Sequence, residues 1–173
     1  QRARGAHGNP DAAPRGHDRL RRAFAPIGHR FDQDLDAGQF GAAMGYAVFY
    51  PNYRGSTGRG VAFSKLSQGD AAGKEFDDLV DAVDHLVATG LVDAKKVGIT
   101  GGSYGGYASA WGATYYSDRF AASVMFVGIS NNVSKVGTTD IANEEFAVHA
   151  LKKPWEDWDF KLKRSPIYYS DRH

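Results

Sequence analysis

The sequence contains no cysteine. Disulfide bonds, catalytic thiolates and metal sites built from cysteine are therefore excluded within these 173 residues. Chains without cysteine occur in reducing and in oxidising compartments alike, so this absence does not separate the cytoplasm from the periplasm. We expect a soluble chain in one of these two compartments.

Long apolar runs and a strong net charge are also missing. No run approaches the roughly 18 apolar residues that cross a bilayer, and the first residues lack the apolar stretch of a secretory signal. The formal net charge is only +1, which gives no reason to expect a polyanionic partner. We therefore predict neither a membrane nor a nucleic-acid partner.

Lysine is absent before Lys65, although arginine is frequent there. Residues 1–30 carry seven arginines against two aspartates, and they show neither a helical nor an alternating apolar period. This composition predicts an irregular or disordered segment over residues 1–37, followed by a folded domain over 38–173. A nucleic-acid-binding arm and an out-of-frame translation of a GC-rich gene are the alternative explanations of the arginine-rich segment.

From residue 38 onward the apolar pattern becomes regular. Short apolar runs alternate with segments whose apolar residues recur at helical spacing, and the connections between them are short. Strand and helix in alternation imply right-handed crossovers and a parallel sheet with helices on both faces, so the predicted fold class is α/β. The pattern predicts strands over 46–50, 96–100 and 122–127, and helices over 74–89 and 107–116.

Five glycines surround one serine at the junction of the second strand with its helix. The segment 101–105 reads Gly-Gly-Ser-Tyr-Gly and matches G-x-S-x-G, the turn that exposes a nucleophilic serine in a strained backbone conformation. We predict that Ser103 is a nucleophile and that the backbone N–H of Tyr104 donates to the developing oxyanion. The segment lacks the Gly-Lys pair of a phosphate-binding P-loop, and it has Thr100 where a dinucleotide-binding fingerprint needs glycine. Both of these sites are therefore excluded. An ordinary strand-to-helix turn with an incidental serine is the remaining alternative.

Four segments together resemble the catalytic domain of the prolyl oligopeptidase family, in the branch of acylaminoacyl and dipeptidyl peptidases. They read YAVFYPNYRGSTGRG, QGDAAGKEFDD, GITGGSYGGYASAW and RSPIYYSD, and the resemblance runs from about residue 38 to residue 171. It implies an α/β-hydrolase fold that cleaves peptides with a serine, aspartate and histidine triad, without a cofactor or metal. It also implies an N-terminal β-propeller in the full protein.

The resemblance assigns further site residues. The aromatic side chain of Tyr104 is expected to contact the substrate, and the segment near Ile129 and Asn132 is expected to form a wall of the specificity pocket. The family's His-Gly-Gly-Pro turn contributes to the oxyanion hole. Its counterpart here is residues 7–10, which makes Gly8 and Asn9 the candidate oxyanion turn.

The triad partners of Ser103 are not evident in the sequence. The acid and the histidine follow the serine in α/β-hydrolases, each after a later strand, and the sequence ends at His173 where the acid's strand is expected. We therefore predict a fold that is incomplete on its C-terminal side, without the triad aspartate and histidine. His149 is interpreted as a surface or packing residue, and Arg54 as a structural guanidinium that binds a nearby aspartate.

The predicted function is that of a serine peptidase that hydrolyses oligopeptides through an acyl-enzyme on Ser103. The same turn serves ester hydrolysis, so a carboxylesterase of the same fold is one alternative. A catalytically inactive fragment is the other, because a serine without a base is a weak nucleophile. Endopeptidase and exopeptidase action both remain open.

Overall fold

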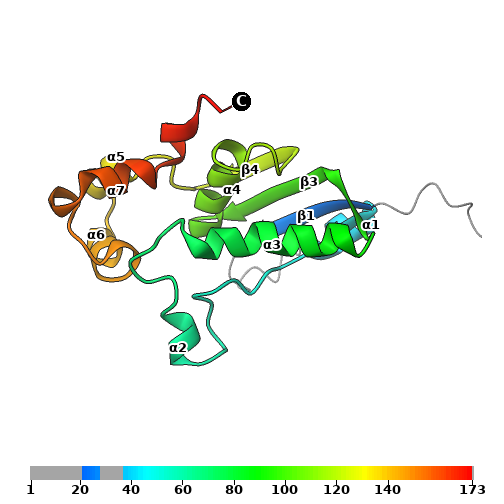
Figure 1. The fold of residues 1–173 in the computed structure, drawn as a ribbon, viewed down its shortest axis with the longest axis horizontal. Helices are drawn as coiled ribbons and strands as arrows, with labels where there is room; N and C mark the ends of the chain where they lie inside the picture. Colours follow the sequence, from blue (N-terminus) through cyan, green and yellow to red (C-terminus); the bar gives the residue numbers. More distant parts are fainter. Residues whose placement is uncertain (1–20, 28–36, 173) are drawn as a thin grey trace, which may run out of the picture.

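A computed structural model describes residues 21–27 and 37–172 (Figure 1). Four strands form one parallel sheet in the order β2-β1-β3-β4. Among the described residues, no helix is both long and apolar enough to cross a membrane. The strands are β1 (Arg21–Ile27), β2 (Tyr46–Val48), β3 (Val92–Gly102) and β4 (Ala122–Phe126).

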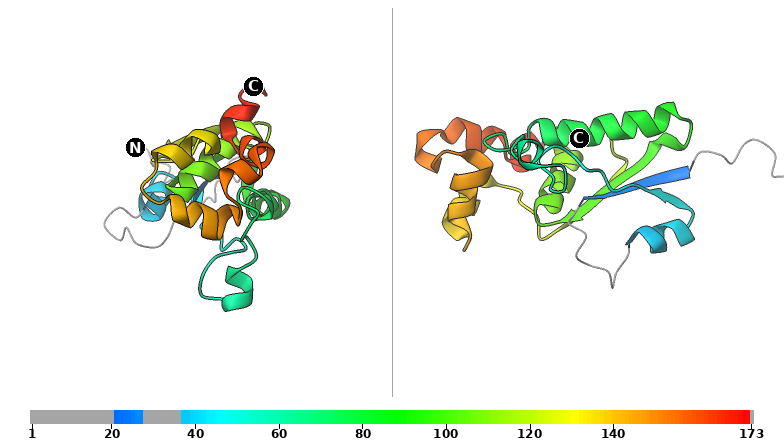
Figure 2. Two further views of the ribbon diagram at one scale, coloured as in Figure 1. Left: turned by 90° about the vertical axis from the view of Figure 1, so that its left-hand side faces the viewer. Right: turned by 90° about the horizontal axis from the view of Figure 1, so that it is seen from below.

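Helices cover both faces of this sheet. Seen from below, α1 (Ala37–Ala43) and α3 (Lys74–Ala88) lie on opposite sides of the strands (Figure 2, right). The helix α4 (Tyr104–Thr114) packs against β3 and β4, and its aromatic side chains meet those of α3. The predicted α/β class, with a parallel sheet between helices, is confirmed.

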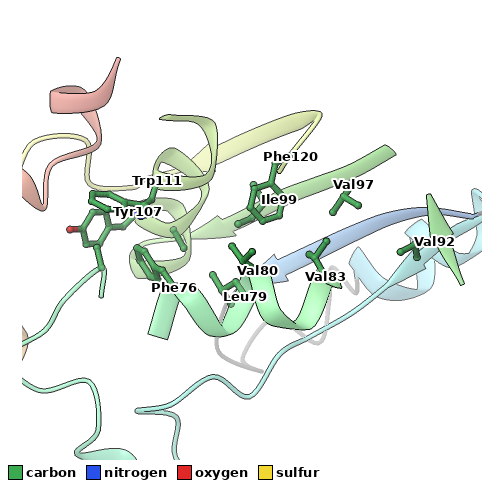
Figure 3. Packing of buried hydrophobic residues seen from close by; sticks show 12 residues of the cluster. Phe76, Leu79, Val80, Val83, Val92, Val97, Ile99, Tyr107, Trp111 and Phe120 are labelled. Atoms are coloured by element: carbon green, nitrogen blue, oxygen red, sulfur yellow. The ribbon is translucent and has the colours of Figure 1, made fainter. Parts of the chain in front are cut away.

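The hydrophobic core lies between α3, α4 and the sheet (Figure 3). The apolar residues of α3 recur at helical spacing, so they project from one face of the helix into this core. Burial of these side chains is the main favourable term that holds α4, and with it the end of β3, in place. The cluster includes Phe76, Leu79, Val80, Val83, Val92, Val97, Ile99, Tyr107, Ala108, Trp111 and Phe120.

Strand β1 lies inside the segment that was expected to be irregular. It occupies the centre of the sheet, where Arg22–Phe24 pair with β2 and Ala23–Ile27 pair with β3. The apolar run over 23–27 is the sequence signal for this strand, but the arginines around it and Pro26 argue against a central strand. The pairing of β1 with β2 ends at Phe24, so Pro26 faces only Thr100 of β3 and is tolerated there. The remainder of segment 1–36 lies outside the described residues, so the domain boundary at residue 37 stays a prediction.

The observed bounds differ in places from the sequence-based prediction, most of all at the start of β3. Strand β3 begins at Val92 instead of residue 96, because Val92 pairs with Arg21 before the ladder resumes at Val97. The intervening residues 93–96 form an irregularity, so the regular part of the strand starts close to the predicted position. Helix α4 begins at Tyr104, directly after Ser103 as the serine turn requires, although the apolar pattern itself starts only at residue 107 because the first turn contains glycines.

Short helices follow β4 and gather beyond the tip of β3, at one end of the molecule (Figure 1). A carboxylate joins them, because Glu145 accepts hydrogen bonds from Lys135 (3.0 Å) and from the buried ammonium of Lys161. These helices are α5 (Asn132–Thr138), α6 (Ala142–Glu144), the π-helix η1 (Glu145–Ala150), η2 (Pro154–Glu156), α7 (Trp158–Lys163) and η3 (Pro166–Tyr169). A further short helix, α2 (Val61–Ser64), precedes α3.

Candidate active site

Ser103 is the single residue between β3 and α4. Its backbone has φ 55° and ψ −114°, a conformation that costs an L-residue free energy. The Ser103 N–H donates to the carbonyl oxygen of Phe126 at the end of β4 (3.1 Å), and the Ser103 carbonyl accepts from Tyr107 N–H (3.0 Å). The side chain is exposed, and within the described part of the chain its Oγ has no hydrogen-bond partner. The predicted position of Ser103, directly after the strand and before the helix, is confirmed.

A close approach of two backbones requires glycine next to this turn. A Cβ added at Gly106 would lie 2.3 Å from the Phe126 carbonyl oxygen and 2.7 Å from Gly128 Cα. Gly128 is equally crowded, because its Cβ would lie 2.5 Å from the Gly106 carbonyl carbon. The first turn of α4 therefore packs directly on the loop after β4, and this contact holds the serine turn in place.

Backbone strain occurs at and near the same turn. Four non-glycine residues in the described ranges have a positive φ, and they are Ala72, Ser103, Val127 and Leu151. Val127 directly follows the residue whose carbonyl holds Ser103, and the Ala72 N–H points to the Tyr104 hydroxyl at 3.4 Å. Strained backbone of this kind is often found at active sites, where surrounding contacts enforce it.

Tyr104 presents its backbone to the site and its side chain to the interior. Its N–H belongs to the first turn of α4, where backbone donors lack helical partners, and no described residue accepts from it. The hydroxyl donates to the buried carboxylate of Glu75 (Oε1, 2.7 Å), and the ring stacks on His149 with centroids 5.0 Å apart. Burial, and then the negative charge of Glu75, raise the pKa of the Tyr104 hydroxyl. The N–H is thus free to donate, whereas the hydroxyl is already occupied.

The two residues expected at the pocket wall lie in different environments. Ile129 comes three residues after Phe126 and is partly buried against the core cluster. Asn132 is buried, and its Nδ2 donates to Tyr107 Oη (2.8 Å) and to the Arg164 carbonyl oxygen (2.6 Å). Its amide is therefore part of an internal network and is not directed at Ser103.

No base or acid contacts Ser103 in the part of the chain that the structure describes. His149 lies over the ring of Tyr104, with Nε2 3.5 Å from Glu144 Oε1, and it makes no hydrogen bond to the serine. The described residues also hold no group of three or more metal-ligating side chains. The candidate oxyanion residues Gly8 and Asn9 lie outside the described residues.

Arg54 attaches the loop before α3 to that helix. Arg54 Nε and Nη2 donate to Asp78 (2.9 and 2.5 Å), and the backbone N–H of Arg54 donates to the same carboxylate (2.8 Å). The interpretation of Arg54 as a structural residue that binds a nearby aspartate is confirmed. Burial alone would raise the pKa of Asp78, but these hydrogen bonds and the positive charge of Arg54 hold it below its ordinary value of 3.8.

We expect Asp78→Asn to lower the free energy of unfolding by about 1–3 kcal/mol at pH 7, because charge-assisted hydrogen bonds are lost. Because the pKa of Asp78 is lower in the folded state than in the unfolded state, its ionisation stabilises the folded state at any pH above the unfolded-state pKa. This contribution disappears as the pH falls through the folded-state pKa. Thermal unfolding at pH 7 and at pH 3 should therefore show a smaller difference between wild type and variant at pH 3. An equal difference at both pH values would contradict the charge-assisted bond.

Sequence reasoning missed the residues that hold Tyr104. Glu75 is fully buried at the start of α3, and its position among the acidic residues of this helix gave no indication of that. Arg164 comes from the far end of the chain, yet its Nη2 donates to Asp70 Oδ1 (2.7 Å) and its Nη1 donates to the Ala72 carbonyl. Only the three-dimensional fold brings these segments together.

Comparisons with known proteins agree on one family. A model described as the prolyl oligopeptidase family matches residues 34–172. Dipeptidyl aminopeptidase BIII of Pseudoxanthomonas mexicana is 50% identical over 93 residues, which cover 54% of this chain and 14% of the relative.

Solved structures of two peptidases share the fold. A puromycin-hydrolyzing peptidase of Mycobacterium tuberculosis superimposes with a TM-score of 0.79 at 28% identity, covering 94% of this chain and 26% of that chain. An acylaminoacyl peptidase of Pyrococcus horikoshii superimposes with a TM-score of 0.77 at 25% identity, and the match covers 90% of this chain and 26% of that chain. The chain thus spans about a quarter or less of the length of these relatives. Its family match, its fold and its serine turn agree, and the chain belongs to the prolyl oligopeptidase family of serine peptidases.

Proposed function

We propose that the full-length protein is a serine peptidase that hydrolyses oligopeptides through an acyl-enzyme on Ser103. The observation that carries this proposal is the conformation of Ser103, which has positive φ and an exposed side chain at the β3–α4 junction. A serine incidental to an ordinary turn has no need of the strained backbone that Phe126 and Gly106 support. The family to which the chain belongs supplies the reaction class.

In this mechanism the Ser103 Oγ attacks the carbonyl carbon of the scissile peptide bond. The oxygen of that carbonyl becomes negative, and the Tyr104 N–H at the start of α4 donates a hydrogen bond to it. A histidine accepts the serine proton and passes it to the leaving amine, after which water releases the acyl group. We infer that this histidine and its aspartate come from parts of the protein outside these residues, since no described imidazole or carboxylate contacts Ser103.

The substrate contacts proposed for this chain lie beyond the carboxyl ends of β3 and β4. We propose Ile129 as a wall residue, because it follows the loop that supports Ser103. Asn132 and the ring of Tyr104 support this wall. Asn132 does so through its hydrogen bond to Tyr107, and the Tyr104 ring does so through its stack on His149. The names of the relatives, which include dipeptidyl and acylaminoacyl peptidases, support short peptides as substrates. A β-propeller in the full protein, one that limits substrate size, is part of the same proposal.

Turnover of matched amide and ester substrates by the full-length protein tests the function. Dipeptidyl or acylaminoacyl p-nitroanilides should be hydrolysed, and Ser103→Ala should lower kcat by about a thousandfold or more. Ser170→Ala, which removes an exposed hydroxyl after η3 and outside the proposed pocket wall, is the matched control and should stay within about twofold of wild type. Ester turnover without amide turnover would identify a carboxylesterase instead, and full activity of Ser103→Ala would refute the nucleophile.

A further inference from the structure

A buried carboxylate without a cation lies directly behind the serine turn. Glu75 has 0% of its surface exposed, and no described lysine, arginine or histidine forms an ion pair with it. Its two oxygens have separate donors, since Oε1 accepts from the Tyr104 hydroxyl (2.7 Å) and Oε2 accepts from Gly73 N–H (3.1 Å). Burial raises the pKa of Glu75, as expected for a carboxylate removed from water. A side chain so costly to bury is a candidate for a functional role.

Tyr104 is held at the far end of its side chain and on its ring. The hydroxyl that donates to Glu75 also accepts from Ala72 N–H at 3.4 Å. The ring stacks on His149 and lies 5.6 Å from the ring of Phe76 and 5.5 Å from the ring of Tyr107. A side chain with these contacts has little freedom, so the Cα–Cβ bond of Tyr104 has a fixed direction.

The loop that presents Glu75 is itself fastened. Arg164 donates to the Ala72 carbonyl and to Asp70, and both acceptors precede the first turn of α3. The loop therefore cannot shift without breaking bonds to a segment that lies more than ninety residues later in the chain. Glu75 thus offers Tyr104 a rigid acceptor.

We propose that Glu75 is a positioning residue for the Ser103 turn, acting through the Tyr104 hydroxyl. By holding Tyr104 from the inside, it keeps the peptide between Ser103 and Tyr104 oriented so that the Tyr104 N–H faces the oxyanion position. This inference rests on the proposed function. It differs from a purely structural role, in which Glu75 would only cap the start of α3 through Gly73.

Four variants of the full-length protein separate these roles. Tyr104→Phe removes the hydroxyl alone, whereas Glu75→Gln leaves one carbonyl oxygen for two donors. Each should lower kcat about tenfold with KM within about twofold, because the interaction matters in the transition state. The double variant should be no slower than the slower single variant, since both changes break the same contact. Tyr116→Phe is the matched control, because its hydroxyl donates to Asp77 on α3 away from Ser103, and its kcat should be unchanged.

The rate of labelling by a fluorophosphonate gives a second measure and should fall in parallel with kcat. Unchanged kcat in Tyr104→Phe, or single effects that multiply in the double variant, would overturn the inference. Tyr104→Phe alone is sufficient for this test if Glu75→Gln does not fold. Ser103→Ala, measured beside the others, keeps the two proposals distinct. If Ser103→Ala is inactive while Tyr104→Phe is as active as wild type, the role of Glu75 is refuted and the assignment of Ser103 as the nucleophile stands.

Discussion

The 173 residues alone should hydrolyse peptides at least about a thousandfold more slowly than the full-length protein. The reason is that no described residue takes the Ser103 proton, and loss of one triad member removes several orders of magnitude of rate. The measurement is the initial rate on the same p-nitroanilide at equal molar concentration. The relatives reported above are about four or more times longer than the matched region, which leaves room for the missing partners.

A local base would give the opposite result. His149 is the imidazole that this result would implicate, because its ring stacks on Tyr104, the residue after Ser103. Full activity of the 173 residues that is lost in Ser103→Ala and also in His149→Ala would make His149 the base. In the proposed account, His149→Ala in the full-length protein removes a stacking partner of Tyr104 and lowers the rate by no more than about tenfold.

Gly106→Ala should destabilise the protein by about 3 kcal/mol or more and prevent correct formation of the serine turn. The added Cβ would lie 2.3 Å from the Phe126 carbonyl oxygen, which is also the acceptor for Ser103 N–H. Relief of this clash requires α4 to move away from β4, and the bond that holds Ser103 would then break.

The matched control is Gly137→Ala, which changes another helical glycine in open space. Because alanine favours a helix over glycine, this variant should be as stable as wild type or slightly more stable. Urea unfolding followed by far-UV circular dichroism compares the two. Equal stability of Gly106→Ala and wild type would contradict the close packing of α4 on the loop after β4.

The elements that the sequence predicted well are those with a strong local signal. Helix α3 has an apolar face and ends near Gly90, so its predicted and observed bounds differ by one residue. Strand β1 was missed because a central strand is defined by the neighbours with which it pairs, and Pro26 with the surrounding arginines obscured its short apolar run. The apolar pattern marks α4 only from residue 107, because Gly105 and Gly106 serve close backbone contact and carry no apolar signal, whereas the start at Tyr104 follows from the serine turn.

The candidate site divides in the same way. Ser103 could be predicted because the serine turn is encoded by five consecutive residues. The role of Glu75 could not be predicted, because its partner Tyr104 is 29 residues away and its neighbours in the sequence are other acidic side chains. Asn132 was expected at a pocket wall from the resemblance, but the structure directs its amide to Tyr107 and the Arg164 carbonyl. Local motifs thus identify the reacting group, whereas its support depends on contacts between distant segments.

Mass spectrometry of the full-length protein after treatment with a fluorophosphonate tests directly whether Ser103 is the nucleophile. After proteolysis, we expect a single phosphonylated peptide that contains residues 98–111, with the added mass on Ser103. The adduct should be absent when the protein is unfolded before treatment, since an unactivated serine does not react. An adduct on a different serine, or a fully active enzyme that carries no adduct, would contradict the claim.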